Sequence, residues 1–162
     1  MLHSVHCGYQ AGQNLPHLHH HVLDNDFPGF KSHDASDEVL RLTDVVETRI
    51  LTKGGITVVA GGHRAGQCYV VPTGDFIFQT DVGEVLFRLI QMFAEKFKSK
   101  QGLPPDFMFS SRFRNGEFVY GKFIPILNNW GTTEYHALEG EQPFTLPWPH
   151  EKTVRHLTGG ES

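Results

Sequence analysis

The chain has 162 residues and a formal net charge of −4 at pH 7, with 39% hydrophobic and 20% charged residues. This length suits one domain with a buried core, and the acidic balance excludes the electrostatic footprint of a general nucleic-acid binder. No apolar run reaches the ~18 residues of a membrane span, and residues 1–20 lack a signal-peptide core. Because Cys7 and Cys68 make no disulfide framework, a reducing cytoplasm is the expected compartment.

The N-terminal third predicts short elements joined by loops. Residues 2–6 resemble the end of a strand, and residues 7–16 form a glycine-bearing loop. Residues 17–23 alternate in polarity and end in apolar side chains, which is typical of a short strand. A linker with Pro28 and Gly29 follows, and Ser36 is a suitable N-cap for a short helix.

The rest of the chain predicts an antiparallel sheet with a helix on it. Gly54-Gly55 and Asn115-Gly116 are two-residue hairpin signals between apolar runs. The expected elements are strands over 47–53, 56–60 and 67–71, a helix over 81–98, strands over 107–113 and 118–127, and an edge strand over 132–138. After Gly140 we expect a polar surface tail. The predicted fold class is α+β.

The histidines are concentrated near the N-terminus, where six of the 11 lie within the first 21 residues. On a strand, His17, His19 and His21 share one face because residues two apart point the same way. Three neutral imidazoles suit phosphate chemistry, since one can attack phosphorus while its neighbours hydrogen-bond the phosphoryl oxygens. The preceding glycines, Gly8 and Gly12, let backbone N–H groups approach an anion.

Two other interpretations compete with a phosphate site at these histidines. One is a surface histidine cluster, which includes adventitious metal binding. The other is a structural zinc on His17 with Cys7 and His6, which is disfavoured because no second Cys/His pair lies nearby and zinc takes four ligands. We therefore expect no cofactor and no metal.

One continuous motif resembles a known family. It reads Gly8-x-x-Ala11-Gly12-Gln13-Asn14-x-x-His17-Leu18-His19-His20-His21-Val22-Leu23. This resembles the signature of the histidine-triad superfamily of nucleotide hydrolases and transferases, which is His-φ-His-φ-His-φ-φ after a Gly-Gln-Ser/Thr turn. The chain departs from it with Asn14 in place of Ser or Thr, with His20 at an apolar position, and with His6 where members often carry an Asn that contacts phosphate.

The resemblance implies roles for the matching residues. His19 would attack the α-phosphorus and form a nucleotidyl-histidine, His21 would contact the phosphate, and His17 would orient the nucleophile. The residues implied to hold the phosphates or the leaving group are Gly8, Gly12, Gln13, Asn14 and His6. Arg112, Arg114 and Lys122 are further candidates to neutralise a substrate phosphate from a neighbouring chain.

The remaining chain resembles the same superfamily more loosely, as a second unit whose triad position, 119–125, has no histidine. An active first triad and a degenerate second unit are typical of galactose-1-phosphate uridylyltransferase and its relatives, which include dinucleoside polyphosphate phosphorylases. The implied organisation is the active-site loop and triad strand of a first unit over 1–35, a histidine-triad-like second unit over 36–142, and a tail over 143–162.

The expected function is a nucleotide phosphoric-anhydride or phosphoramidate hydrolase or nucleotidyltransferase, with phosphorolysis also open. The alternative is a non-catalytic nucleotide-binding or structural module, because the first unit's own sheet and helix are absent. The expected partners are a nucleotide substrate and either a second copy in a homodimer or a missing half-domain, with no membrane and no general nucleic-acid binding.

Overall fold

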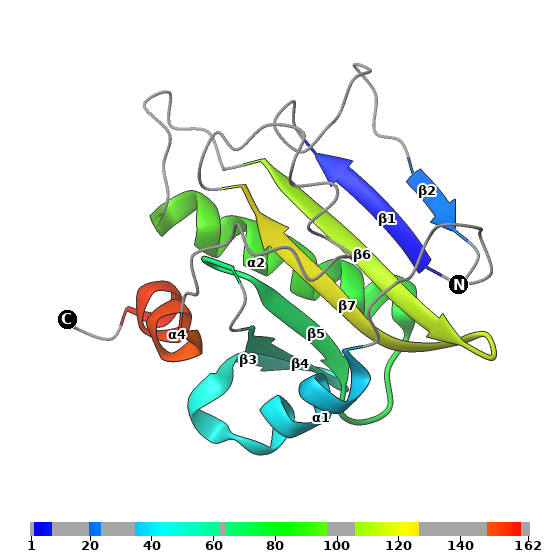
Figure 1. Cartoon of the computed structure of the whole chain (residues 1–162), viewed down its shortest axis with the longest axis horizontal. Coiled ribbons are helices and arrows are strands. Elements are labelled where there is room, and N and C mark those ends of the chain that lie inside the picture. The colour runs from blue at the N-terminus through cyan, green and yellow to red at the C-terminus, as the bar shows by residue number, and fades with distance from the viewer. Residues whose placement is uncertain are drawn as a thin grey trace.

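A computed structural model describes residues 2–7, 20–23, 35–61, 64–96, 106–126 and 149–159. Their strands form one antiparallel sheet in the order β2-β1-β6-β7-β5-β4-β3 (Figure 1). The strands are β1 (Leu2–Cys7), β2 (His20–Leu23), β3 (Arg49–Lys53), β4 (Ile56–Ala60), β5 (Cys68–Pro72), β6 (Phe107–Arg114) and β7 (Glu117–Pro125). The α+β prediction is confirmed.

Both predicted hairpins are present. Gly54 and Gly55 join β3 to β4, and Gly54 has a φ of 55°. Asn115 and Gly116 join β6 to β7 with φ values of 53° and 82°. Two consecutive positive φ values are the pattern of a type I′ turn, whose twist matches that of the flanking strands. This turn chemistry explains why the two longest strands pair as a hairpin.

The N-terminal strands join the same sheet. The expected strand over 2–6 is β1, which pairs with β2 on one side and with β6 on the other. Part of the expected strand over 17–23 is β2, while residues 17–19 lie outside the described residues, as does the expected edge strand over 132–138. Residues brought together here are far apart in sequence, since Leu2 is the partner of Arg112.

The long helix begins earlier than predicted. A π-helical turn, η3 (Phe78–Val82), leads directly into α2 (Gly83–Lys96), whereas the sequence predicted a start at Asp81. The Asp81 carboxylate accepts the backbone N–H of Ile77 at 2.6 Å, which fixes the chain at the start of this turn. The predicted last residues, 97 and 98, lie outside the described residues.

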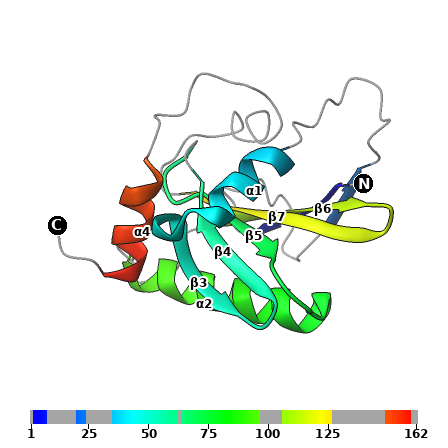
Figure 2. The same cartoon turned by 90° about the horizontal axis from the view of Figure 1, so that it is seen from below.

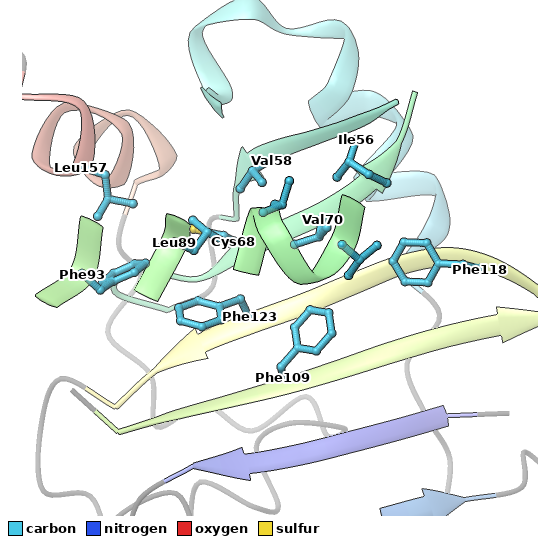
Figure 3. Close-up of a cluster of buried hydrophobic side chains, with 12 residues drawn as sticks. Ile56, Val58, Cys68, Val70, Leu89, Phe93, Phe109, Phe118, Phe123 and Leu157 are labelled. Carbon is cyan, nitrogen blue, oxygen red and sulfur yellow. The ribbon is translucent and has the colours of Figure 1, made fainter. Parts of the chain in front are cut away.

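One face of the sheet packs against α2 and forms the main core (Figure 3). Helix α2 contributes Leu89 and Phe93, which are 0% and 1% exposed. The labelled strand side chains of this core are Ile56, Val58, Cys68, Val70, Phe109, Phe118 and Phe123. Burying large apolar side chains of this kind stabilises a fold by about 1.5–3 kcal/mol each.

The opposite face is covered in part by α1 (Ser36–Asp44), so the sheet lies between α1 and α2 (Figure 2). Ala35 and Val39 pack there against Val59, Tyr69 and Tyr120. The predicted N-cap is wrong by one residue, because Ala35 holds that position and Ser36 is the first helical residue. A short 3-10 helix, η2 (Val46–Thr48), then delays the start of β3 to Arg49.

The C-terminal segment contains a helix where the sequence predicted a surface tail. Helix α4 (His150–Thr158) buries Thr153 and Leu157, and Leu157 belongs to the main core. Only two large apolar residues, Val154 and Leu157, occur in this helix, three positions apart in an otherwise polar segment. Gly159 ends it with a φ of 80°, the left-handed conformation common after a helix.

Candidate functional site

Of the eight site residues that the motif resemblance implies, the structure describes two, both as positions in strands. His21 lies in β2 as the Cα partner of Ser4, and His6 lies in β1 as the Cα partner of Met108. Their strands are direct neighbours in the sheet. The other predicted site residues, His17, His19, Gly8, Gly12, Gln13 and Asn14, lie outside the described residues.

A single row of Cα partners runs across the sheet from His21. It continues through Ser4 of β1, Ser110 of β6, Lys122 of β7 and Tyr69 of β5. Residues directly opposite in antiparallel strands share a face. Tyr69 packs with Ala35 and Val39 at α1. Since Ser110 and Lys122 share its face, all three residues lie on the α1 side of the sheet. We call these three residues the polar row.

The polar row is buried. Ser110, Lys122 and Tyr69 are only 5%, 9% and 1% exposed. Lys122 and His21 are three strands apart, which corresponds to about 14 Å at the usual strand spacing. A lysine cation at this depth is costly to bury unless anionic or dipolar groups surround it. Lys122 therefore requires polar or anionic partners at this position.

Within the polar row, Lys122 is a predicted phosphate ligand, whereas Ser110 and Tyr69 were not predicted from the sequence. A signal was present in part, since Ser110 interrupts the apolar run of β6. The other candidates are placed differently. Arg112 is the Cα partner of Leu2 and Tyr120 and lies two residues along β6 from Ser110 of the polar row. Arg114 is exposed at the β6–β7 turn.

Two tyrosines and a carboxylate connect the polar row to α1. The rings of Tyr69 and Tyr120 meet edge to face with centroids 5.9 Å apart. Burial raises the pKa of Tyr69 well above its ordinary value, and the nearby Glu38 carboxylate raises it further. Tyr69 therefore keeps its proton at physiological pH and can donate a hydrogen bond.

The two thiols are poor nucleophiles. Cys68 is fully buried and donates to the Gly66 carbonyl at 3.3 Å, and burial raises its pKa strongly. Partial burial also raises the pKa of Cys7, with a further contribution from the Asp106 carboxylate. Within the described residues, no group of three or more His, Cys, Asp and Glu side chains is arranged to hold a metal ion. No described helix combines the length and apolarity needed to cross a membrane.

Comparison with known proteins identifies the fold but no family. No family model matches the chain. No curated protein matches it. Among solved structures it is similar to one titled a structure of uridylyltransferase, with a TM-score of 0.59, 11% identity, and coverage of 98% of this chain and 59% of that one. A uridylyltransferase mutant structure matches with the same TM-score, 13% identity, and coverage of 98% and 62%.

This chain therefore spans about 60% of the length of the uridylyltransferase chains that it matches. At these identities the likeness concerns the fold alone. It supports an antiparallel α+β architecture like that of the uridylyltransferase structures, in agreement with the predicted α+β class.

Proposed function

We propose that this protein cleaves or transfers nucleotides at a phosphoric anhydride or phosphoramidate through a nucleotidyl-histidine intermediate on His19. The observation that carries the proposal is the triad motif itself, whose last histidine, His21, lies on β2 in the same sheet as Ser110 and Lys122 and in register with them. The uridylyltransferase-like fold supports the same chemistry.

In the proposed first step, an imidazole nitrogen of His19 attacks the α-phosphorus. The new P–N bond forms as the bond from phosphorus to the leaving group breaks, and the leaving group departs with the bonding electron pair. His17 orients the attacking ring, and His21 donates a hydrogen bond to a phosphoryl oxygen. The side chains of Gln13 and Asn14 and the backbone N–H groups of Gly8 and Gly12 hold the remaining oxygens.

In the second step, an acceptor oxygen attacks the same phosphorus and the P–N bond breaks. Water as the acceptor gives hydrolysis, inorganic phosphate gives phosphorolysis, and a sugar phosphate gives transfer. The imidazole then returns to its starting state. Lys122, about 14 Å from His21 across the sheet, would act on the negative charge of the substrate only at longer range.

We also propose that the chain joins the end of one histidine-triad-like unit, residues 1–35, to a degenerate second unit over 36–142. The sheet order supports this division, since the pair β1–β2 lies beside the pair β6–β7 with β1 against β6. In that arrangement, the degenerate triad position on β7 corresponds to the active triad on β2.

The competing proposal is a module that binds nucleotides or supports structure without catalysis. It is favoured by one observation: β7 has β5 as its outer neighbour, whereas among the described strands β2 has none. A triad strand without a neighbour on that side has less surface with which to form a nucleoside pocket.

Intact-mass spectrometry at mildly alkaline pH, where a phosphoramidate survives, tests the proposal. The protein is mixed briefly with dinucleoside polyphosphates, nucleotide sugars or adenosine phosphoramidate. We expect an adduct of one nucleotide in the native protein and in His20→Ala, and none in His19→Ala. No adduct and no turnover with any of these substrates would contradict catalysis and favour the binding module.

A further inference from the structure

Helix α1 is attached to the sheet by a narrow contact. Of residues 35–44, only Ala35 and Val39 are buried, with exposed fractions of 1% and 2%, whereas Leu40 is 61% exposed. Ala35 holds the N-cap position and offers no side-chain oxygen to the first helical N–H groups. A helix of nine residues is marginal by itself in water, so the stability of α1 depends on its contact with the sheet.

The two ends of α1 are held in different ways. At the first turn, the hydroxyl oxygen of Tyr120 accepts the Ala35 N–H at 3.2 Å. Beside it, Tyr69 donates a hydrogen bond to the Glu38 carboxylate. At the other end, fully buried Thr48 donates its hydroxyl hydrogen to a backbone carbonyl of α1 at 2.6 Å. The first turn is therefore held by two phenols of the sheet, and the last turn by a residue that adjoins β3.

The surface beneath α1 differs from the core beneath α2. Helix α1 contributes two small buried side chains to its contact, and the sheet presents two phenols there that water can also hydrogen-bond. Helix α2 instead contributes Val85, Leu89 and Phe93 to the main core, where no such groups compensate for exposure. Separating α1 from the sheet therefore costs less than separating α2, and local opening occurs where buried apolar contacts are few.

We propose that α1 is a hinged cover, which moves away from Tyr69 and Tyr120 as a unit while the sheet and α2 stay folded. The hinge is Thr48 with η2, and the latch is the contact of Tyr120 with Ala35. In the open state, the two phenols lose the contacts of α1 on the side of the sheet that carries Lys122.

Opening of this cover also changes how the triad strand is tethered. Strand β2 ends at Leu23, and residues 24–34 connect it to Ala35, which the latch holds against β7. When the latch opens, the next fixed point along the chain is Thr48. The connection that follows β2 is therefore longer in the open state. The inference concerns the motion of α1 and is independent of the proposed chemistry.

Labelling with an aromatic disulfide, which reacts with accessible thiols, tests this proposal without any activity measurement. Val39→Cys places a thiol on the buried face of α1, and Cys68 in the main core is the built-in reference for global unfolding. Cys7→Ala removes the remaining thiol. We expect the introduced thiol to react at least about 100-fold faster than Cys68 under native conditions. Leu40→Cys, on the exposed face of the same helix, is the matched control and gives the rate of an uncovered thiol.

Tyr120→Phe removes the latch and should accelerate labelling of the introduced thiol by about tenfold, because the Ala35 N–H loses its acceptor. A reaction as slow as that of Cys68 would overturn the proposal, since α1 would then leave the sheet only when the whole chain unfolds. A labelling rate that Tyr120→Phe leaves unchanged would overturn it as well.

Amide hydrogen exchange of the unaltered chain provides a second test that needs no variant. The Val39 N–H, which is bonded to the Ala35 carbonyl, should exchange about 100-fold faster than the amides of Leu89 and Phe93 in α2. Its exchange should also depend less on low concentrations of urea, because opening α1 exposes less surface than global unfolding does. Equal exchange rates with equal urea dependence would contradict local opening of α1.

Discussion

The phenolic oxygen of Tyr120 accepts a hydrogen bond from the backbone N–H of Ala35 at 3.2 Å, although the two residues are 85 positions apart. Both are buried, with exposed fractions of 4% and 1%. The bond fixes the start of α1 against β7, two residues along the strand from Lys122. The carbonyl of Ala35 in turn accepts the N–H of Val39, so this contact joins the first turn of the helix to the sheet.

Replacing Tyr120 with Phe should lower the free energy of unfolding by about 1–3 kcal/mol, because a buried N–H would lose its acceptor. Chemical denaturation followed by circular dichroism measures this change. Thr158→Val is a suitable control, since its hydroxyl bonds to the Val154 carbonyl at an exposed position. Equal stability of Tyr120→Phe and the native protein would show that another group satisfies the Ala35 N–H.

Two glycines should respond to alanine in opposite directions. A Cβ at Gly55 would lie 2.1 Å from the backbone oxygen of Asp75, whereas a Cβ at Gly83 meets nothing within 4 Å. Gly83 has helical dihedral angles at the start of α2.

We therefore expect Gly55→Ala to lower the unfolding free energy by more than about 1 kcal/mol, because the backbone must move. Gly83→Ala should raise it by about 0.5–1 kcal/mol, because alanine loses less conformational entropy in a helix. Thermal denaturation of both variants checks the pair. A lower melting temperature for Gly83→Ala would contradict the open space around that position.

Local patterns predicted the hairpins and the long helix because their causes lie in adjacent residues. Asn115-Gly116 selects its turn through its own dihedral preferences, and the apolar spacing of residues 83–96 is visible in the sequence. Helix α4 was not predicted, because the contacts that stabilise it come from residues distant in sequence. Its buried side depends on Thr153 and Leu157 meeting the rest of the fold, and so short and polar a segment gives a weak signal by itself.

The candidate site likewise has one part that the sequence predicts and one part that it does not. The spacing of His17, His19 and His21 is a local pattern, so the sequence alone indicated phosphate chemistry. The polar row is set by pairings between distant segments, namely β1 with β6 and β5 with β7. Register between such strands depends on which faces are buried, and it cannot be deduced from any one strand.

The stability of the fold should decline at alkaline pH, in part through Tyr69. Burial and Glu38 raise its pKa in the folded protein above the ordinary 10.0. As the pH rises past about 10, the unfolded chain loses this proton while the folded chain keeps it, so folding loses up to about 1.4 kcal/mol per pH unit for this group. Below pH 10 the contribution of protonated Tyr69 to the free energy of unfolding is fully present.

Urea unfolding at several pH values between 8 and 11 tests this linkage, with the slopes compared between native protein and Tyr69→Phe. The variant should lose less stability per pH unit above pH 10. Cys68→Ala should remove a similar decline that begins near pH 9, the ordinary value for a thiol. Identical slopes in all three proteins would show that neither buried group controls the alkaline transition.

Lys122 provides the sharpest test of how the polar row relates to the proposed chemistry. Lys122→Met keeps the length of the side chain and removes its charge. If the cation stabilises the substrate phosphates, kcat/KM should fall about 10²–10³-fold, the usual effect of losing one charge-stabilising donor. Lys96→Met, at an exposed position near the end of α2, should leave kcat/KM unchanged.

A purely structural lysine gives a different result, because replacing a buried cation with an apolar side chain often maintains or raises stability. Unchanged kcat/KM together with equal or greater stability in Lys122→Met would therefore remove Lys122 from the site while leaving the role of His19 to be decided by the covalent adduct.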